Sequence, residues 1–126
     1  MDEITLKKIE KFSRITPSMH LAFERVVDDW SPEIPPLTIL FAEIGDSFVR
    51  DFKAIDDRES QAVFNAIETM LTGKDEALNV GASTGFLEAI AVKPEFDKKA
   101  KSMLGEESKK FLHAWLQFMN SPNLDS

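Results

Sequence analysis

Apolar side chains recur along this chain at intervals of three or four residues, which is the period of an amphipathic α-helix. Proline, glycine and helix-capping residues divide the pattern into segments, and no segment sustains the apolar–polar alternation of a half-buried strand. The pattern predicts an all-α fold: a compact bundle of six to seven helices in a single domain over residues 1–120. The expected helices cover about residues 2–14, 17–30, 36–52, 57–72, 75–91, 95–104 and 106–120, and residues 121–126 are expected to form a frayed C-terminal tail.

The boundaries of these helices follow from residues that start or end helices for physical reasons. Thr16 precedes Pro17, so a capping hydroxyl and a proline at the first helical position mark the start of the second helix. Asp56 and Glu59 have the spacing of a capping box at the start of the fourth helix. Gly73 is expected to end that helix in the left-handed conformation, which glycine adopts without strain.

Three glycines lie inside predicted helices, where each weakens the helix by about 1 kcal/mol relative to alanine. Gly45 indicates close contact with a neighbouring helix. Gly81 and Gly85 are four residues apart and raise the question of a phosphate loop, but no strand precedes them and the lysine of such a loop is absent. Small residues at this spacing instead predict close helix packing. The helix over 75–91 is apolar nearly all round, so it is expected to be the most buried.

The composition supports a core that needs no covalent staples. Of the 126 residues, 43% are hydrophobic, and ten phenylalanines and two tryptophans are among them. Cysteine is absent, which excludes disulfides, thiolate metal sites and cysteine nucleophiles. No apolar run approaches the roughly 18 residues of a membrane span, and the charged N-terminus has no signal-like apolar region, so a cytoplasmic location is expected. The last helix is expected to bury Phe111, Leu112, Trp115 and Met119.

The charge balance favours a basic protein as partner. Acidic residues number 22 and basic residues 15, which gives a net charge of −7. This charge repels nucleic acid and anionic membranes, and it accelerates the approach of a basic protein. The alternative is that the negative charge only keeps the protein in solution.

Two groups of acidic residues are candidates for contact with such a partner. Asp28, Asp29 and Glu33 surround a tryptophan and a proline-stiffened connection between the second and third helices. Asp46, Asp51 and Asp57 run across the end of the third helix and the start of the fourth, and the two groups would form one negative face if they lie close together. Trp30 itself is expected to close the core, and the alternative is an exposed anchor for a partner.

The chemistry of enzymes finds little support in this sequence. His20 and His113 lie in no nucleophile-elbow motif, and no zinc-ligand spacing occurs, so no catalytic residue, metal or cofactor is predicted. A carboxylate-based or metal-dependent enzyme remains an alternative. In that case Glu43 or Glu88 would line a closed pocket, and Glu88 is the more interesting because it follows an apolar run.

Several short motifs in the chain from about Pro35 onward suggest a family. Pro35-Pro36 leads into an amphipathic helix, Gly85-Phe86-Leu87-Glu88 follows, and Leu104-Gly105-Glu106-Glu107-Ser108 opens a last helix that contains Trp115. This order resembles an uncharacterised bacterial family of small acidic helical proteins, whose relatives often lie beside toxin genes. The sequence departs from that pattern at Gly105-Glu106, where a proline would be expected at the first helical position.

The resemblance implies an immunity-like role, in which the protein binds a toxin domain and blocks its active site. The leading hypothesis is therefore a protein-binding module, not an enzyme, that uses an acidic face to bind a basic partner. A second hypothesis is a homodimeric helical adaptor or regulatory module. An exposed apolar stripe of the first or the last helix would then be the interface, so both a monomer and a homodimer remain open.

Overall fold

The computed structural model describes residues 1–120, and these residues form helices joined by short connections. The first four helices are α1 (Glu3–Ser13), α2 (Pro17–Trp30), α3 (Leu37–Arg50) and α4 (Asp57–Thr72), and a 3-10 turn at Phe52–Ala54 separates the last two. Next come α5 (Glu76–Val80), a π-helical segment (Gly81–Leu87) and α6 (Glu88–Ala91), which follow one another without a break and are called the α5–α6 helix below. The final elements are α7 (Lys98–Ser102) and α8 (Glu106–Asn120).

The prediction of an all-α, single-domain bundle of six to seven helices is confirmed. With the α5–α6 helix counted as one, the described residues form seven helices and no strand. The expected frayed tail, residues 121–126, lies outside the described residues. None of the helices within residues 1–120 has both the length and the apolar character that crossing a membrane requires. The expected helix over 95–104 is shorter in the structure, and the third ends at Arg50 instead of residue 52.

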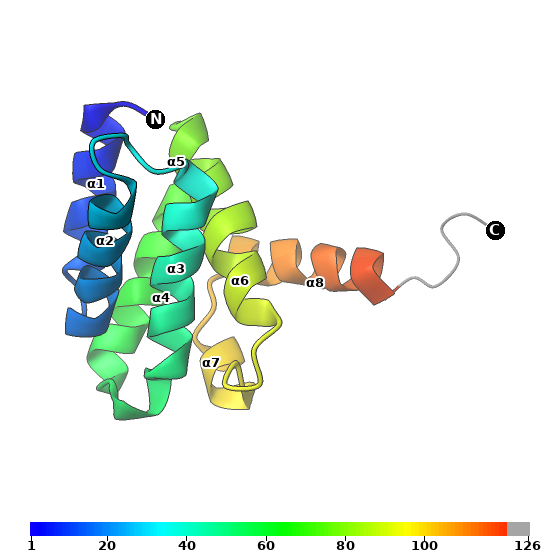
Figure 1. Cartoon of the computed structure of the whole chain (residues 1–126). Coiled ribbons are helices and arrows are strands. Elements are labelled where there is room, and N and C mark those ends of the chain that lie inside the picture. The colour runs from blue at the N-terminus through cyan, green and yellow to red at the C-terminus, as the bar shows by residue number, and fades with distance from the viewer. Residues whose placement is uncertain (121–126) are drawn as a thin grey trace.

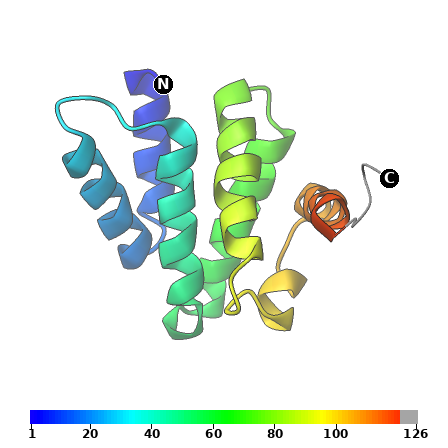
Figure 2. The same cartoon turned by 45° about the vertical axis from the view of Figure 1, so that its right-hand side comes forward.

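The helices form an up-and-down bundle with one helix set apart (Figure 1). The first four helices and the α5–α6 helix run roughly along the long direction of the bundle, and α8 runs roughly at right angles to them. The turned view shows the same separation, with α8 beside the bundle and seen nearly end-on (Figure 2). The C-terminal half of α8 therefore stands clear of the other helices.

Close packing of α3 against the α5–α6 helix builds the centre of the core. A Cβ atom on Gly81 would collide with the ring of Phe41, and one on Gly85 would lie 2.5 Å from the Phe41 Cβ. A Cβ atom on Gly45 would lie 3.2 Å from the backbone oxygen of Phe86, so the approach is close from both sides. The predictions that these glycines mark helix contacts, and not a phosphate loop, are confirmed.

A cluster of phenylalanines extends this contact to the other helices. The Phe86 ring lies 5.8 Å from that of Phe12 on α1 and 5.9 Å from that of Phe48 on α3, between ring centroids. Phe48 in turn packs edge to face on Phe64 of α4, at 5.3 Å. These separations are favourable for aromatic pairs, so the cluster joins four helices in one core.

The expectation that the helix over 75–91 is the most buried is only partly right. The α5 part of this helix contains no buried residue, and the first buried residue is Gly81 in the π-helical segment. The π-helical segment is also wider than the ordinary helix that the sequence predicts, and it buries both Phe86 and Leu87 completely. The helix α3, which carries Phe41 and Phe48, is buried to a similar degree.

Side-chain caps define most of the helix starts, as the sequence predicts. The carboxylates of Asp2 and Asp56 accept the amide N–H groups of Thr5 and Glu59, and the Thr16 hydroxyl accepts that of Met19. The chain enters α1, α2 and α4 at these residues. Each cap satisfies one backbone donor that the helix itself leaves without a partner.

The expected left-handed conformation of Gly73 is wrong. This residue is extended, with φ −79° and ψ 178°. The carbonyl groups at the end of α4 are satisfied from elsewhere, because the side-chain amide of Asn79 donates to the carbonyls of Met70 at 2.6 Å and Gly73 at 3.1 Å. A side chain of the next helix thus replaces the glycine cap that the sequence suggested.

A carboxylate from α4 caps the first turn of α8. Glu68 accepts hydrogen bonds from the amides of Glu107 at 2.7 Å and Ser108 at 3.0 Å, and from the Ser108 hydroxyl at 2.8 Å. A Cβ atom on Gly105 would collide with this carboxylate. Gly105, which precedes α8, leaves open the space that the Glu68 carboxylate occupies, and Glu106 stands at the first helical position where a proline was expected.

Two apolar side chains that were expected in the core are exposed. Trp30 at the end of α2 is 38% exposed, and Met119 near the end of α8 is 58% exposed. Trp30 lies where α2 reaches the end of the bundle, and Met119 lies on the part of α8 that leaves it (Figure 1). The helical periodicity continues at both positions, but Trp30 borders an open hollow toward α3, and Met119 lies on the part of α8 that stands clear of the bundle.

The glycine contact leads to a first prediction. We expect Gly81→Ala to lower the free energy of unfolding by about 1–3 kcal/mol, because the new methyl group overpacks the site of the Phe41 ring. Urea denaturation measures this change. Thr84→Ala, an exposed position in the same segment, is the control and should have little effect. Equal stability of Gly81→Ala and the wild type would contradict the packing described.

The cap of α8 leads to a second prediction. Burial raises the pKa of the Glu68 carboxyl, but the hydrogen bonds from Glu107 and Ser108 outweigh it, so the pKa lies below its ordinary value of 4.5. Ionised Glu68 therefore adds stability above pH 4.5, and this stability is lost as the pH falls through the lowered pKa. Glu68→Gln should cost about 0.5–2 kcal/mol at neutral pH, as loss of a helix cap does.

Urea denaturation at several pH values tests the loss of this cap. The difference in stability between the wild type and Glu68→Gln should shrink as the pH falls below 4.5. Glu76→Gln, in the first turn of α5, is a matched control without such a set of hydrogen bonds. A difference that is the same at pH 7 and at about pH 3 would show that the carboxylate charge has no part in the cap.

Candidate functional site

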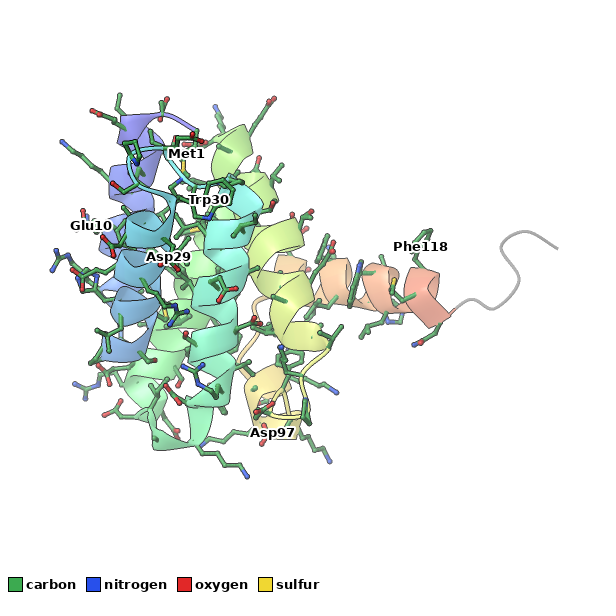
Figure 3. All side chains as sticks on the ribbon, in the orientation of Figure 1. Met1, Glu10, Asp29, Trp30, Asp97 and Phe118 are labelled. Carbon is green, nitrogen blue, oxygen red and sulfur yellow. The ribbon has the colours of Figure 1, made fainter. Side chains whose placement is uncertain are left out.

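The connection between α2 and α3 presents acidic and apolar side chains together on the surface. We call Asp28, Asp29, Trp30, Glu33 and Ile34 the α2–α3 corner; all five are exposed, with Trp30 at 38% and Ile34 at 40%. Figure 3 shows Trp30 and Asp29 near the end of α2. None of the ion pairs formed within residues 1–120 involves an acid of this corner.

Local backbone contacts and prolines hold the corner in shape. The amide of Ser31 donates to the Asp28 carbonyl at 3.2 Å, and that of Glu33 donates to the Trp30 carbonyl at 2.8 Å. The connection between α2 and α3 contains three prolines, at positions 32, 35 and 36, and each proline ring fixes the backbone angle φ of its residue. The exposed side chains are therefore carried by a backbone with restricted freedom.

Asp28 and Asp29 point to different sides of α2, although they are neighbours in sequence. Asp28 lines a groove of about 570 Å³ between α1 and α2. Asp29 and Trp30 line a smaller hollow of about 200 Å³ toward α3, beside Ile39 and Glu43. Successive residues on a helix differ by about 100° in direction, and this separates the two carboxylates. The first acidic group thus faces two surfaces that meet at the end of α2.

Two members of the second acidic group lie at the other end of the bundle. Asp51 and Asp57 flank the turn between α3 and α4, opposite the end that carries the α2–α3 corner (Figure 1). The 14 residues of α3 span about 21 Å, so Asp51 and Asp57 do not join the first group in the single negative face considered from the sequence. Asp46 lies within α3 and lines a hollow with Glu43, which also borders the hollow of Asp29.

Each member of the second acidic group has a basic neighbour. The ion pairs are Asp46 with Lys93 at 3.6 Å, Asp51 with Arg50 at 3.5 Å and Asp57 with Lys99 at 2.7 Å. Exposed pairs of this kind add little stability, but they neutralise much of the local charge. Of the predicted contact residues, those of the first group are therefore the ones that keep their charge free for a partner.

The carboxylates considered for catalysis have ordinary structural neighbours. Glu43 forms an ion pair with Arg25 at 3.3 Å across the α2–α3 contact. Burial raises the pKa of Glu88, but this residue lines neither of the two hollows beside α2. Within residues 1–120, no group of three or more His, Asp or Glu side chains is placed to hold a metal ion.

His20 lies between a serine and a glutamate, an arrangement that sequence spacing did not reveal. Its Nδ1 is 3.2 Å from the Ser13 hydroxyl, and its Nε2 is 3.6 Å from a carboxylate oxygen of Glu24. A hydrolase triad has the same residue types, with an accessible serine and a buried acid. Here Ser13 is fully buried and donates to the Glu10 carbonyl at 2.6 Å, while Glu24 is 61% exposed. The set therefore joins α1 to α2 and offers no nucleophile to a substrate.

A second exposed surface lies on α8 and is apolar. Phe118 is 62% exposed and Met119 is 58% exposed, on the part of the helix that leaves the bundle (Figure 3). An adjoining groove of about 260 Å³ runs between α8 and the segment around α7, and its lining is mainly apolar, with Phe96, Leu104, Leu112 and Leu116 among its residues. This surface differs in chemistry from the α2–α3 corner and lies away from it.

Comparison with known proteins identifies a family but no characterised relative. No curated protein and no solved structure matches the chain. One family, described as a domain of unknown function (DUF7674), matches residues 9–120, which includes nearly all of the bundle and the whole of α8. The chain belongs to the DUF7674 family.

Proposed function

We propose that this protein is a binding module that recognises a basic protein through the α2–α3 corner. The observation that carries the proposal is the set of exposed carboxylates on Asp28, Asp29 and Glu33, which take part in no ion pair within residues 1–120. Exposed Trp30 and Ile34 lie among them. Large apolar side chains ringed by polar ones are typical of the residues that dominate binding energy.

The physical properties of the corner suit such a role. Negative charge steers a basic partner toward the surface and raises the association rate, while the apolar side chains slow dissociation once water is excluded. The proline-rich connection loses little conformational freedom on binding, so less of the interaction energy is spent on ordering it.

We further propose that the protein is a bacterial, cytoplasmic, toxin-neutralising protein of the immunity type. A toxin that acts on nucleic acid carries positive charge near its active site, because its substrate is a polyanion. An acidic corner complements such a site and occludes it without any catalytic residue. The resemblance to small acidic proteins beside toxin genes supports this identification.

Charge reversal tests the proposed surface. The partner is first isolated by co-purification with the tagged protein from its native host, and its affinity is then measured by calorimetry. We expect Asp29→Lys with Glu33→Lys to weaken binding at least about tenfold and to reduce its dependence on salt, because both attractions become repulsions. Trp30→Ala should cost about 2 kcal/mol if Trp30 is the anchor.

The chain offers a matched control at the other end of the bundle. Asp51→Lys with Glu95→Lys makes the same change in net charge, far from the corner. If this control weakened binding as much as the corner variant, the effect would come from total charge, and the assignment to the α2–α3 corner would be wrong.

A homodimeric adaptor is the second candidate function, and the exposed apolar end of α8 is the observation that favours it. Burial of Phe118 and Met119 against a second copy would remove their side chains from water. Light scattering at increasing protein concentration should then show a rise toward twice the monomer mass, and Phe118→Asp should abolish the rise. A strict monomer at all concentrations would eliminate this candidate.

A further inference from the structure

The groove between α1 and α2 combines an apolar floor with an acidic rim. Its volume is about 570 Å³, and it lies between two helices that run in opposite directions (Figure 1). Residues of α1, of α2 and of the first position after α2 line it: Glu3, Leu6, Lys7, Glu10, Phe23, Glu24, Val27, Asp28 and Ser31. The groove shares Asp28 with the α2–α3 corner but otherwise faces a different side of α2.

The floor of the groove leaves apolar surface uncovered. Phe23 belongs to the core, and Leu6 and Val27 pack against it while remaining partly exposed. Leu6 comes from α1 and Val27 from the facing side of α2, so the open apolar surface lies along the line where the two helices meet. Apolar side chains of another molecule would complete the packing at this line.

The rim of the groove carries four carboxylates and a single ammonium group. Glu10 pairs with Arg14 at 3.1 Å and Glu24 lies 3.6 Å from His20, but Glu3 and Asp28 take part in no ion pair within residues 1–120. The acids come from both helices, so negative charge borders the apolar floor on both sides. The charge of the rim is complementary to lysine and arginine side chains.

The dimensions of the groove select a helix as its occupant. From Glu3 to Glu10 the lining of α1 extends over seven residue steps, or about 10 Å, which is about two helical turns. A helix that lies along this line presents apolar side chains three or four residues apart to the floor and directs basic side chains toward both rims. An extended strand lacks a free sheet edge to pair with, because both walls are helices.

We infer that the α1–α2 groove binds a basic amphipathic helix of the partner protein, which lies along α1 and α2 as a third packed helix. The inference rests on the proposed function for the existence of a basic protein partner, and it adds the binding groove and the kind of segment that enters it. The α2–α3 corner then contacts a neighbouring part of the same partner, since Asp28 borders both surfaces.

A synthetic peptide tests the groove directly. The probe is a fluorescein-labelled helical peptide of about 14 residues, roughly 21 Å long, with leucines three and four residues apart and lysines on both sides of that stripe. Its binding to the full chain is measured by fluorescence anisotropy. A scrambled peptide of the same composition, without the leucine stripe, separates groove binding from attraction by charge alone.

Charge reversal at two exposed residues of the rim should change the affinity for the peptide in opposite directions. Glu24→Lys should weaken peptide binding about fivefold to twentyfold, because it replaces an attraction at the rim by a repulsion. Lys7→Glu removes the single base of the rim and should strengthen binding. Glu95→Lys makes the same charge change as Glu24→Lys outside the groove and should leave the affinity within about twofold, as distant exposed charges are screened.

Several results would overturn the inference. They are the absence of saturable binding, equal binding of the scrambled peptide, equal weakening by Glu24→Lys and Glu95→Lys, or no gain from Lys7→Glu. Val27→Gln keeps the charge and adds polarity to the floor, so it should weaken the leucine-striped peptide and not the scrambled one. Circular dichroism of each variant verifies that the bundle is folded.

The host partner separates this inference from the proposed function. The host partner could lose affinity for the Asp29→Lys, Glu33→Lys double variant while Glu24→Lys and Val27→Gln have no effect. This result would support the proposed function and exclude the groove as a binding site. The opposite result is saturable binding of the leucine-striped peptide, but not of the scrambled one, together with the absence of any basic host partner. The groove would then be a helix-binding site, and the proposed function would be wrong.

Discussion

The structure depends on two helices lying closer together than most side chains allow. Phe41 of α3 fills the space that Cβ atoms on Gly81 and Gly85 would need, and its ring becomes part of the phenylalanine cluster. That cluster is where α1 and α4 meet the central pair through Phe12 and Phe64. The positions of α1 and α4 therefore follow from one close contact, and so do the surfaces at their outer edges.

The distribution of charge follows from the same arrangement. Basic residues after α6 and in α7 fold back toward the α3–α4 end of the bundle, where Lys93 and Lys99 meet Asp46 and Asp57. At the far end of α2, Asp28, Asp29 and Glu33 take part in none of the ion pairs formed within residues 1–120. The result is a protein whose net negative charge is paired at one end and unpaired at the other within residues 1–120, and this asymmetry is the basis for proposing the α2–α3 corner as the binding surface.

The sequence was sufficient for the features that depend on neighbours along the chain. Helical periodicity, the caps at Thr16 and Asp56, and the close helix packing at Gly81 and Gly85 all follow from local spacing. The features that it missed depend on residues far apart in sequence. Asn79 replaces the expected cap at Gly73, and Glu68 caps α8 across 39 residues. Lys93 and Lys99 of later segments pair with Asp46 and Asp57 of the second acidic group. Periodicity predicts which face of a helix is apolar, but not whether a neighbouring helix covers that face, so the burial expected for Trp30 and Met119 was wrong.

The attachment of α8 at its first turn has a practical consequence for the geometry of tethering. Glu68 fixes the start of the helix on α4, and the rest of α8 leads away from α1 and α2 (Figure 2). A surface, label or second domain joined to the end of α8 would therefore be held at a distance, on the side of the molecule remote from α1. Immobilisation at that end would leave the acidic end of α2 open to solution, so the orientation of the protein on a sensor or a scaffold depends on the partly buried carboxylate that holds the first turn of α8.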